Sequence, residues 1–314
     1  MKQIHGGVTA APGFKAAGVH AGLKDSHQKD FAIILSDSQA TAAGVFTQNR
    51  VCAAPVTLCR DHIRNQVANA IVINSKNANA CTGHQGLEDA YSTAKLAGET
   101  LGVNSNSIFV CSTGVIGQQL PMDIIENGIH LAVQMLDGDG GHDAAQAIMT
   151  TDIVPKEVAV ETKIDGHSII IGGMAKGSGM IAPNMATMLS FLTTDVNISP
   201  EILQTTLQTA TRKSFNRVTV DSDTSTNDTV LILANGVAEN PQITAHHQEF
   251  QNALDFVCIE LAKMIARDGE GATKLLEIVI NNARNENESY EDYRKRLKQN
   301  SEILKLYSVV GLDA

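Results

Sequence analysis

An apolar segment near the middle of the chain, AKGSGMIAPNMATMLSF at 175–191, constrains the fold more than any other stretch. Its only charged residue is Lys176. Gly177 and Gly179 open backbone conformations that other residues avoid, and Pro183 fixes its own φ and restricts the residue before it. Apolar runs that are typical of strands flank the segment. The pattern therefore predicts a buried turn between two strands rather than an exposed surface loop.

Thr187 is the candidate reactive residue of this segment. A threonine hydroxyl is a weak nucleophile, and one way to activate it is to free the threonine's own α-amine as a base. An α-amine titrates at about 7.7–8.0, close to the pH at which general bases work best. The peptide bond to be cut would be Ala186–Thr187, and the small Ala186 side chain would not obstruct the attacking hydroxyl. An ordinary turn followed by a strand threonine explains the same spacing, so both interpretations stay open.

The composition narrows the classes of protein that the chain can be. Hydrophobic residues make up 43% of the 314 residues, aromatic residues only 4%, and there is no Trp, which predicts an aliphatic core in one large domain or two small ones. The net charge of −10 argues against a nucleic-acid-binding face. No run approaches the roughly 18 apolar residues of a membrane span, and the N-terminus lacks the apolar region of a signal peptide. The five cysteines are irregularly spaced, so we expect reduced thiols and a cytoplasmic protein.

The hydrophobic pattern predicts alternating strands and helices. Short apolar runs predict strands at 31–35, 43–46, 56–58, 70–74, 107–111, 218–220, 229–234 and 274–280. Helical spacing predicts helices at 87–101, 122–136, 143–149, 200–213 and 248–267, and a charged helix at 290–306. The turn dipeptide Asp165-Gly166 predicts a hairpin that joins strands at 158–164 and 168–172.

Two ligand-binding motifs are excluded by residue order, and the chain predicts no metal site and no cofactor. The acidic loop at 221–228 has Thr226 at its sixth position and Ile232 stands at the twelfth, where a calcium loop needs Gly and Glu. The glycine-rich segment around Lys176 lacks the order of a phosphate-binding loop, because the lysine precedes the glycines.

Five motifs together point to a known family. They are NANACTG at 77–83, CSTGVIG at 111–117, TTD at 150–152, KGSGMIAPNMATML at 176–189 and FNRVTVDSDTSTNDT at 215–229. Over about residues 1–287 the chain resembles the ornithine acetyltransferase family, the bifunctional glutamate N-acetyltransferases of arginine biosynthesis. Lys76, or its neighbour, stands where the family shows a glycine. The resemblance implies an α/β, two-domain fold of layered mixed sheets that is N-terminal-nucleophile-like and self-cleaving.

The resemblance assigns a cleavage position and three catalytic residues, Thr187, Thr113 and Gly114. It implies autocatalytic cleavage between Ala186 and Thr187, after which Thr187 carries the acetyl group. Thr113 and Gly114 would form the oxyanion hole, because a hydroxyl and a backbone N–H at a glycine turn can both donate to a developing oxyanion. Without the resemblance, the sequence around Thr113 would indicate a plain turn after a strand.

Three further residues are assigned to substrate binding, together with Thr187. The resemblance implies that Thr150 contacts the substrate, that Lys176 helps to hold its carboxylate, and that Glu270 also binds it. Thr150 could equally cap the end of a helix, and a lone lysine is usually a surface charge. Glu270 follows the predicted helix at 248–267, and a helix C-terminus disfavours negative charge, which hints at a functional reason for a carboxylate there.

The function implied by the resemblance is acetyl transfer from N-acetylornithine to glutamate through an acetyl-threonine intermediate. Acetyl-CoA is also a donor in some family members, and the sequence leaves that open. The two cleaved chains are expected to stay associated and to assemble further into a heterotetramer. Two alternatives remain: an N-terminal-nucleophile amidase or aminopeptidase with water as acceptor, and an inactive remnant that only folds or associates.

The expected organisation of the chain has three parts. Residues 1–186 form the N-terminal part, 187–287 begin the C-terminal part, and 288–314 form a charged tail without family resemblance. Members of the family continue further and carry a C-terminal Asn and Thr that help to close the substrate pocket. A truncated or frame-shifted product is therefore expected.

Overall fold

The computed structural model describes residues 1–181, 188–221 and 225–277. Two compact units divide the chain, Met1–Glu270 and Gly271–Ala314. The helices and strands below all belong to the first unit. Within the described residues of the second unit, 271–277, there is neither helix nor strand.

The described strands form one mixed sheet. They are β1 (Lys2–Ile4), β2 (Phe14–Val19), β3 (Phe31–Phe46), β4 (Val67–Asn74), β5 (Ile108–Ser112), β6 (Lys156–Ile164), β7 (His167–Lys176), β8 (Leu189–Thr194) and β9 (Thr229–Ala234). Their order is β1-β6-β7-β8-β9-β3-β4-β5, and β2 also pairs with β3. The pairs β4–β5 and β8–β9 are parallel and the others are antiparallel.

Strand β3 joins the two halves of this sheet. Its first part, Phe31–Leu35, pairs with β4, and its last part, Thr41–Phe46, pairs with β9, with a register irregularity between Leu35 and Ala40. The predicted strands at 31–35 and 43–46 are therefore one strand of 16 residues. The polar residues between them stay extended because β4 pairs with the strand on both sides of the irregularity, at Phe31–Leu35 and again at Ala40 and Thr41.

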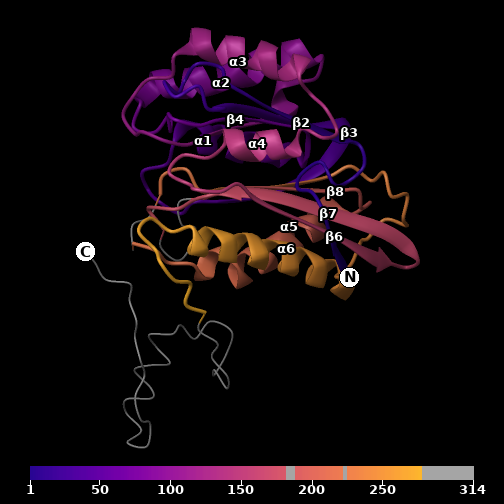
Figure 1. Ribbon diagram of the computed structural model, residues 1–314. Coiled ribbons are helices and arrows are strands. Elements are labelled where there is room, and N and C mark those ends of the chain that lie inside the picture. Colours follow the sequence, from indigo (N-terminus) through magenta and orange to yellow (C-terminus); the bar gives the residue numbers. More distant parts are fainter. Residues whose placement is uncertain (182–187, 222–224, 278–314) are drawn as a thin grey trace, which may run out of the picture. The chain divides into compact units, whose positions relative to one another are not determined.

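Helices cover both sides of the sheet (Figure 1). They are α1 (Ala54–His62), α2 (Gly83–Leu101), α3 (Met122–Gln134), α4 (Gly141–Ala147), α5 (Pro200–Lys213) and α6 (Gln248–Arg267), with short 3-10 turns at Ile63–Asn65, Ser105–Ser107 and Phe215–Arg217. Helices α2 and α3 lie on one side of the strands, and α5 and α6 lie on the other. α4 packs against β2 and β3.

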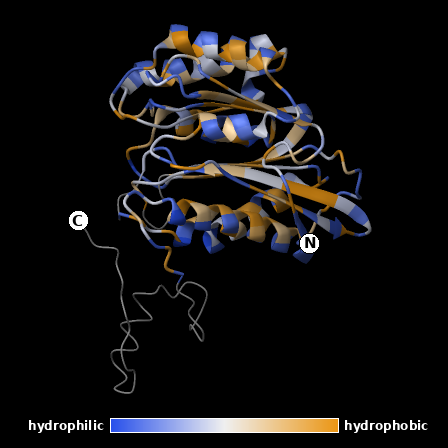
Figure 2. Ribbon diagram, viewed as in Figure 1, coloured by the Kyte–Doolittle hydropathy of each residue, from blue (hydrophilic) through white to orange (hydrophobic). Residues whose placement is uncertain are grey.

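Two large apolar clusters fill the space between these layers. Leu189 and Phe191 of β8 belong to one cluster, and Leu192 belongs to the other. Leu231 and Ile232 of β9 divide in the same way. Because successive side chains of a strand point to opposite faces, both faces of these strands are buried. Figure 2 shows the apolar colour concentrated on the strands and on parts of the covering helices.

Several predicted elements are confirmed with nearly the same bounds. The hairpin is formed by β6 and β7, and both Asp165 and Gly166 have positive φ, at 49° and 88°, as a tight hairpin turn requires. The predicted helices at 200–213 and 248–267 and the predicted strand at 229–234 have the predicted bounds. The helix expected at 290–306 lies outside the described residues.

Three predicted strands are wrong. Residues 56–58 lie in α1, because Pro55 is tolerated in the first turn of a helix and Val56 and Leu58 are buried in helical positions. Residues 218–220 form no strand, although the N–H of Val220 donates to the Ile181 carbonyl at 2.8 Å. The described part of the third, 274–277, has no regular structure.

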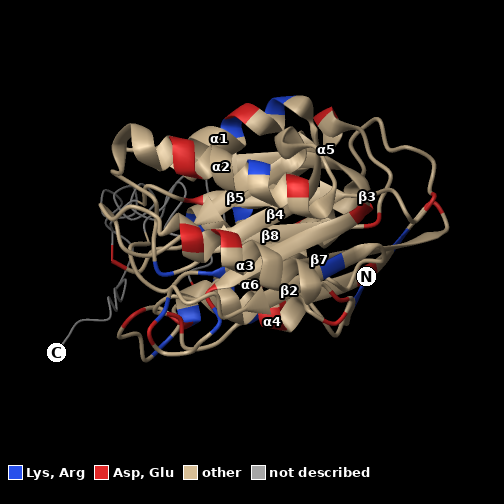
Figure 3. Cartoon of the chain, turned by 90° about the horizontal axis from the view of Figure 1, so that it is seen from above, with Lys and Arg blue, Asp and Glu red and all other residues tan. Residues whose placement is uncertain are grey.

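Charged residues lie mainly on the helices and loops. Figure 3 shows both signs of charge interspersed over these elements. Within the described ranges, none of the helices has the length and apolarity that a membrane crossing needs.

Candidate active site

The central segment singled out in the sequence begins where several strand ends meet. Lys176 is the last residue of β7 and pairs with Leu189, the first residue of β8. Leu189 pairs in turn with Thr229, the first residue of β9, and Phe46 at the end of β3 pairs with Thr229 from the other side. The two strands predicted to flank the segment are therefore present and adjacent. Ala186 and Thr187 lie outside the described residues, so the site is built here from their described neighbours.

Lys176 is buried, with only 3% of its surface exposed. Its Nζ donates a hydrogen bond to Oγ1 of Thr150 at 2.6 Å and lies 3.8 Å from Oδ2 of Asp152. Burial lowers the pKa of Lys176, although the negative charges of Asp152, Asp228 and Glu270 act to raise it. The structure thus brings two predicted substrate-binding residues, Lys176 and Thr150, into direct contact.

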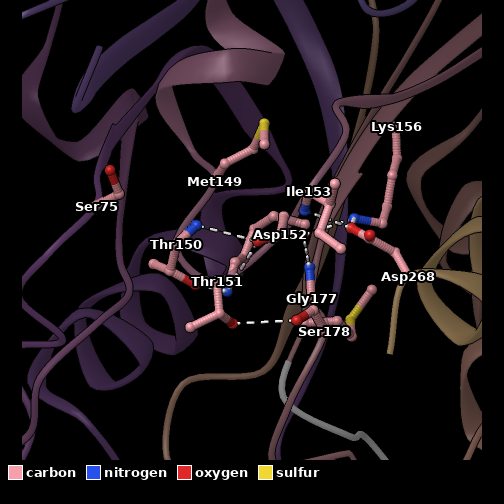
Figure 4. A network of polar contacts seen from close by, with 12 residues as sticks. Ser75, Met149, Thr150, Thr151, Asp152, Ile153, Lys156, Gly177, Ser178 and Asp268 are labelled. Carbon is pink, nitrogen blue, oxygen red and sulfur yellow. Dashed lines mark hydrogen bonds and ion pairs between the residues drawn. The ribbon is translucent and has the colours of Figure 1, made fainter. Parts of the chain in front are cut away.

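A buried ion network lies behind this contact (Figure 4). Nζ of Lys156 lies 2.7 Å from Oδ1 of Asp152 and 2.5 Å from Oδ2 of Asp268. Asp152 also accepts the backbone N–H groups of Gly177 at 2.7 Å and Thr150 at 3.0 Å. Burial alone would raise the pKa of Asp152, but the ammonium groups of Lys176 and Lys156 and the Gly177 N–H outweigh it and hold that pKa below its usual value. The Asp152 carboxylate is therefore charged, and it fixes both sides of the Lys176–Thr150 contact.

Glu270 lies beside the glycine turn that follows Lys176. Its backbone N–H donates to the carbonyl of Ser178 at 2.8 Å. A Cβ added to Gly179 would lie 2.8 Å from the carboxyl carbon of Glu270, so the carboxylate rests directly on the glycine. Helix α6 ends at Arg267, so Glu270 is held by this backbone contact rather than by the helix. The predicted residues Lys176 and Glu270 thus belong to one neighbourhood, in which Glu270 acts to raise the pKa of Lys176.

The predicted oxyanion residues follow the end of β5. The N–H of Thr113 donates to the carbonyl of Asn74 at 3.0 Å, and the hydroxyl of Ser112 donates to Oδ1 of Asn74 at 2.6 Å. Gly114 has φ +132°, and a Cβ there would lie 2.2 Å from the carbonyl carbon of Lys76. Only glycine fits at this position. Lys76 itself has φ +85°, a conformation that favours glycine, which gives a structural reason for the family's glycine in this region.

Two residues that the sequence did not single out connect the oxyanion residues to the segment that contains Thr187. Nδ2 of Asn227 donates to the carbonyl of Ser112 at 2.8 Å and to that of Ala78 at 2.6 Å. Oδ1 of the adjacent Asp228 accepts the N–H of Met188 at 3.0 Å, and Met188 directly follows Thr187 in the chain. In the sequence, Asn227 and Asp228 stand immediately before the apolar run that forms β9, and this position was the signal that could have identified them. The sequence alone indicated only a polar loop at these residues.

The site therefore places a buried ammonium group, a hydroxyl and an exposed carboxylate next to a strand junction. A buried ammonium group at Lys176 suits a carboxylate, and the Glu270 carboxylate suits an ammonium group. Within the described ranges, no group of three or more His, Cys, Asp and Glu residues is arranged to hold a metal ion.

Comparisons with known proteins identify what this chain is similar to. A model of the ArgJ family matches residues 15–301. An arginine biosynthesis bifunctional protein ArgJ from Symbiobacterium thermophilum is 53% identical over 288 residues, which cover 90% of this chain and 72% of the relative. The crystal structure of an ornithine acetyltransferase complexed with ornithine from Mycobacterium tuberculosis is 41% identical, has a TM-score of 0.54, and covers 58% of this chain and 97% of that chain.

A more distant likeness concerns the fold alone. An L-aminopeptidase D-Ala-esterase/amidase from Ochrobactrum anthropi, described as a variant of the N-terminal-nucleophile hydrolase fold, covers 85% of this chain and 86% of that chain. Its TM-score is 0.52 at 12% identity. Together with the mixed sheet, these likenesses confirm the predicted α/β fold and its likeness in fold to an N-terminal-nucleophile hydrolase.

Proposed function

The chain belongs to the ArgJ family, and from this premise we propose that it is an acyltransferase of arginine biosynthesis that moves acetyl from N-acetylornithine to glutamate. One observation carries the proposal for the site: the hydrogen bond between Lys176 and Thr150, at 2.6 Å, stands at the start of the turn that leads to Thr187, with Glu270 beside that turn. A cation, a hydroxyl and an anion together suit an amino acid with its opposite charges.

Thr187 is the nucleophile of the proposed reaction. Cleavage between Ala186 and Thr187 frees the α-amine, which takes the proton from the Thr187 hydroxyl as that oxygen attacks the acetyl carbonyl. The acetyl C–N bond breaks, ornithine leaves with the proton, and an acetyl ester remains on Thr187. The amine of glutamate then attacks the ester carbonyl, the ester C–O bond breaks, a proton of that amine passes to the Thr187 oxygen, and N-acetylglutamate leaves. The Thr113 hydroxyl and the Gly114 N–H would donate to the oxyanion in both steps.

Substrate binding in this proposal uses the charges described above. Lys176 holds the substrate carboxylate, and Thr150 orients it through its hydroxyl. Glu270 binds the ammonium group of N-acetylornithine. Lys176 is buried and Glu270 is exposed, so salt should screen the contact of Lys176 with a substrate less than the contact of Glu270.

Cleavage at Thr187 would leave the two parts of the chain packed together. Met174, from before the cleavage position, shares one apolar cluster with Leu189 and Phe191, from after it. This shared core supports continued association of the two parts, and we further propose assembly into a heterotetramer and a cytoplasmic location, as for a small-molecule biosynthetic enzyme.

The experiment that tests this function is denatured intact mass measurement before and after incubation with N-acetylornithine. We expect two fragments whose masses sum to the chain plus one water, the second of which begins at Thr187. After incubation, the second fragment should be heavier by one acetyl group, and added glutamate should remove it as N-acetylglutamate. Removal by water alone would indicate an amidase, and a single intact chain would contradict the proposal. The same assay with acetyl-CoA tests the second donor.

The Glu270→Gln variant is expected to raise KM for N-acetylornithine with little change in kcat. A hydrogen bond to a charged group contributes about 1.5–3 kcal/mol, so the rise should be about 10- to 100-fold. Steady-state kinetics of both parameters measure it. Glu260→Gln on α6 is the matched control, because Glu260 is partly exposed and forms a 3.8 Å ion pair with Lys263. An unchanged KM in Glu270→Gln would remove Glu270 from the substrate site.

A further inference from the structure

We propose that Asp228 is the proton-transfer residue of the self-cleavage step, which accepts the proton of the Thr187 hydroxyl and returns it to the departing amine. The inference rests on the proposed function, because it concerns the reaction that creates the nucleophile. Before cleavage, the nitrogen of Thr187 is part of a peptide bond and is no base. The uncleaved chain therefore needs another group to activate the hydroxyl.

The position of Asp228 in the chain fold meets this need. Its side chain is fully buried, and Oδ1 accepts the N–H of Met188 at 3.0 Å. A peptide bond joins that nitrogen to the carbonyl carbon of Thr187. The Asp228 carboxyl group is thus separated from the reacting residue by one hydrogen bond and one covalent bond.

The backbone around Asp228 is held on two sides. The N–H of Thr47 donates to the Asp228 carbonyl at 2.9 Å, and the neighbouring Asn227 side chain is anchored on the carbonyls of Ser112 and Ala78. The carboxyl group therefore has a fixed position between the predicted oxyanion residues and the start of β8. A proton acceptor needs such a position, because proton transfer requires hydrogen-bond reach to the reacting group.

The second oxygen of Asp228 is uncommitted. Oδ2 is buried and meets no donor in hydrogen-bonding geometry among the described residues, although the nearby Ser225 hydroxyl acts to lower the pKa of the carboxyl group. Most buried polar side-chain atoms have at least one hydrogen-bond partner, so a buried carboxyl oxygen without one requires an explanation. An oxygen reserved for the Thr187 hydroxyl supplies that explanation.

The electrostatic surroundings suit proton transfer near neutral pH. Burial raises the pKa of Asp228 to about 8, against the opposing influence of the Met188 N–H, the Ser225 hydroxyl and the positive charge of Lys176. Catalytic bases work best when their pKa lies near the working pH. Lys176, at the end of β7, is the charged group that acts on Asp228 among the described residues.

The nearby carboxylate of Asp152 is less suitable. Its oxygens already bind Lys156, Gly177 and the Thr150 N–H, and its pKa is lowered, so it is a poor proton acceptor. The contrast between these two buried carboxyl groups is typical of sites in which the environment divides the roles of acids and bases.

The step is balanced in atoms and charge. Oγ of Thr187 bonds to the carbonyl carbon of Ala186 as its proton moves to the Asp228 carboxylate. The C–N bond between Ala186 and Thr187 then breaks, and the proton passes from Asp228 to the departing nitrogen. The resulting ester is hydrolysed by one water, which leaves the Ala186 carboxylate and Thr187 with a free amine.

The test follows the rate at which the chain, made by cell-free synthesis, converts to two fragments. Asp228→Asn keeps the oxygen that accepts the Met188 N–H and removes the proton acceptor, so cleavage should slow by about 100-fold or more. Asp195→Asn is the matched control: Asp195 is a buried carboxyl with a raised pKa at the other end of β8, where it accepts the Ile170 N–H at 2.8 Å. It should cleave at the rate of the unaltered chain.

A pH profile separates proton transfer from a structural role. Because the base must be ionised to accept the proton, cleavage of the unaltered chain should speed up by about tenfold per pH unit below about 8 and level off above it. A flat profile between about pH 6 and 9 would overturn the inference, even if Asp228→Asn failed to fold.

The remaining outcomes distinguish the inference from the proposed function. If the Asp228→Asn variant cleaves as fast as the Asp195→Asn variant, Asp228 is not the proton-transfer residue. The acetyltransferase proposal is unaffected by that result. If the unaltered chain and Asp195→Asn both stay intact while folded, self-cleavage itself is absent, and the proposed function fails with the inference.

Discussion

Replacing Lys156 with methionine is expected to lower the free energy of unfolding by about 3–5 kcal/mol. The Lys156 side chain is 1% exposed and stands between two buried carboxylates, Asp152 at 2.7 Å and Asp268 at 2.5 Å. Methionine keeps much of the volume but leaves both negative charges without their cation. Removal of one partner from a buried ion network lowers stability strongly, because an uncompensated charge remains buried. This loss is much larger than the difference in stability between the intact network and apolar residues of similar volume.

Urea unfolding measures this change, and Lys213→Met is its matched control. Lys213 lies 2.7 Å from Asp255, but about a third of its side chain is exposed. A pair in such a position contributes about 0–1 kcal/mol, so the two lysine-to-methionine variants should differ several-fold in effect. Equal losses would mean that lost packing, and not unpaired charge, explains the Lys156 result.

A second substitution separates these causes further. Asp268→Asn added to Lys156→Met removes one of the two uncompensated charges, and its amide oxygen can still accept the Ile153 N–H, which Asp268 accepts at 3.0 Å. The double variant should recover part of the lost stability, which a double-mutant cycle expresses as a coupling energy. A double variant less stable than Lys156→Met would contradict the charge argument.

Sequence reasoning succeeded where the pattern is local. Helix α6 has a continuous apolar stripe, and the hairpin of β6 and β7 carries its own turn dipeptide, so neighbouring residues determine both elements. The strand prediction at 56–58 was wrong because a short apolar run has no measurable period. Pro55 was the better signal, since it indicates the start of a helix. The continuity of β3 depends on two partner strands that no local pattern names.

The same distinction holds for the candidate site. Motifs indicated Lys176 and Thr150, which lie 26 residues apart and are in contact. The partnership of Lys156 with Asp268 spans 112 residues, and the contact of Asp228 with Met188 spans 40. Such pairs arise from strand order and burial, so only the fold reveals them.

Substitution of Gly114 by alanine is expected to lower the rate of acetyl transfer by about 10²–10³-fold or more. A Cβ at this position would lie 2.2 Å from the carbonyl carbon of Lys76 and 2.6 Å from the nitrogen of Asn77. Both are backbone atoms, so the loop after β5 must move. The Gly114 N–H, proposed to donate to the oxyanion, would move with it, and loss of one such donor has an effect of this size.

Gly117→Ala is the control that separates displacement of the donor from ordinary backbone strain. Gly117 lies in the same loop and has φ +82°, but a Cβ there meets no atom within 4 Å. It should lose about 1 kcal/mol of stability and keep nearly full activity. Because strain is common to both variants and the clash belongs to Gly114 alone, single-turnover acetylation of Thr187 should be slow only in Gly114→Ala. Equal rates in the two variants would mean that the N–H of Gly114 does not stabilise the oxyanion.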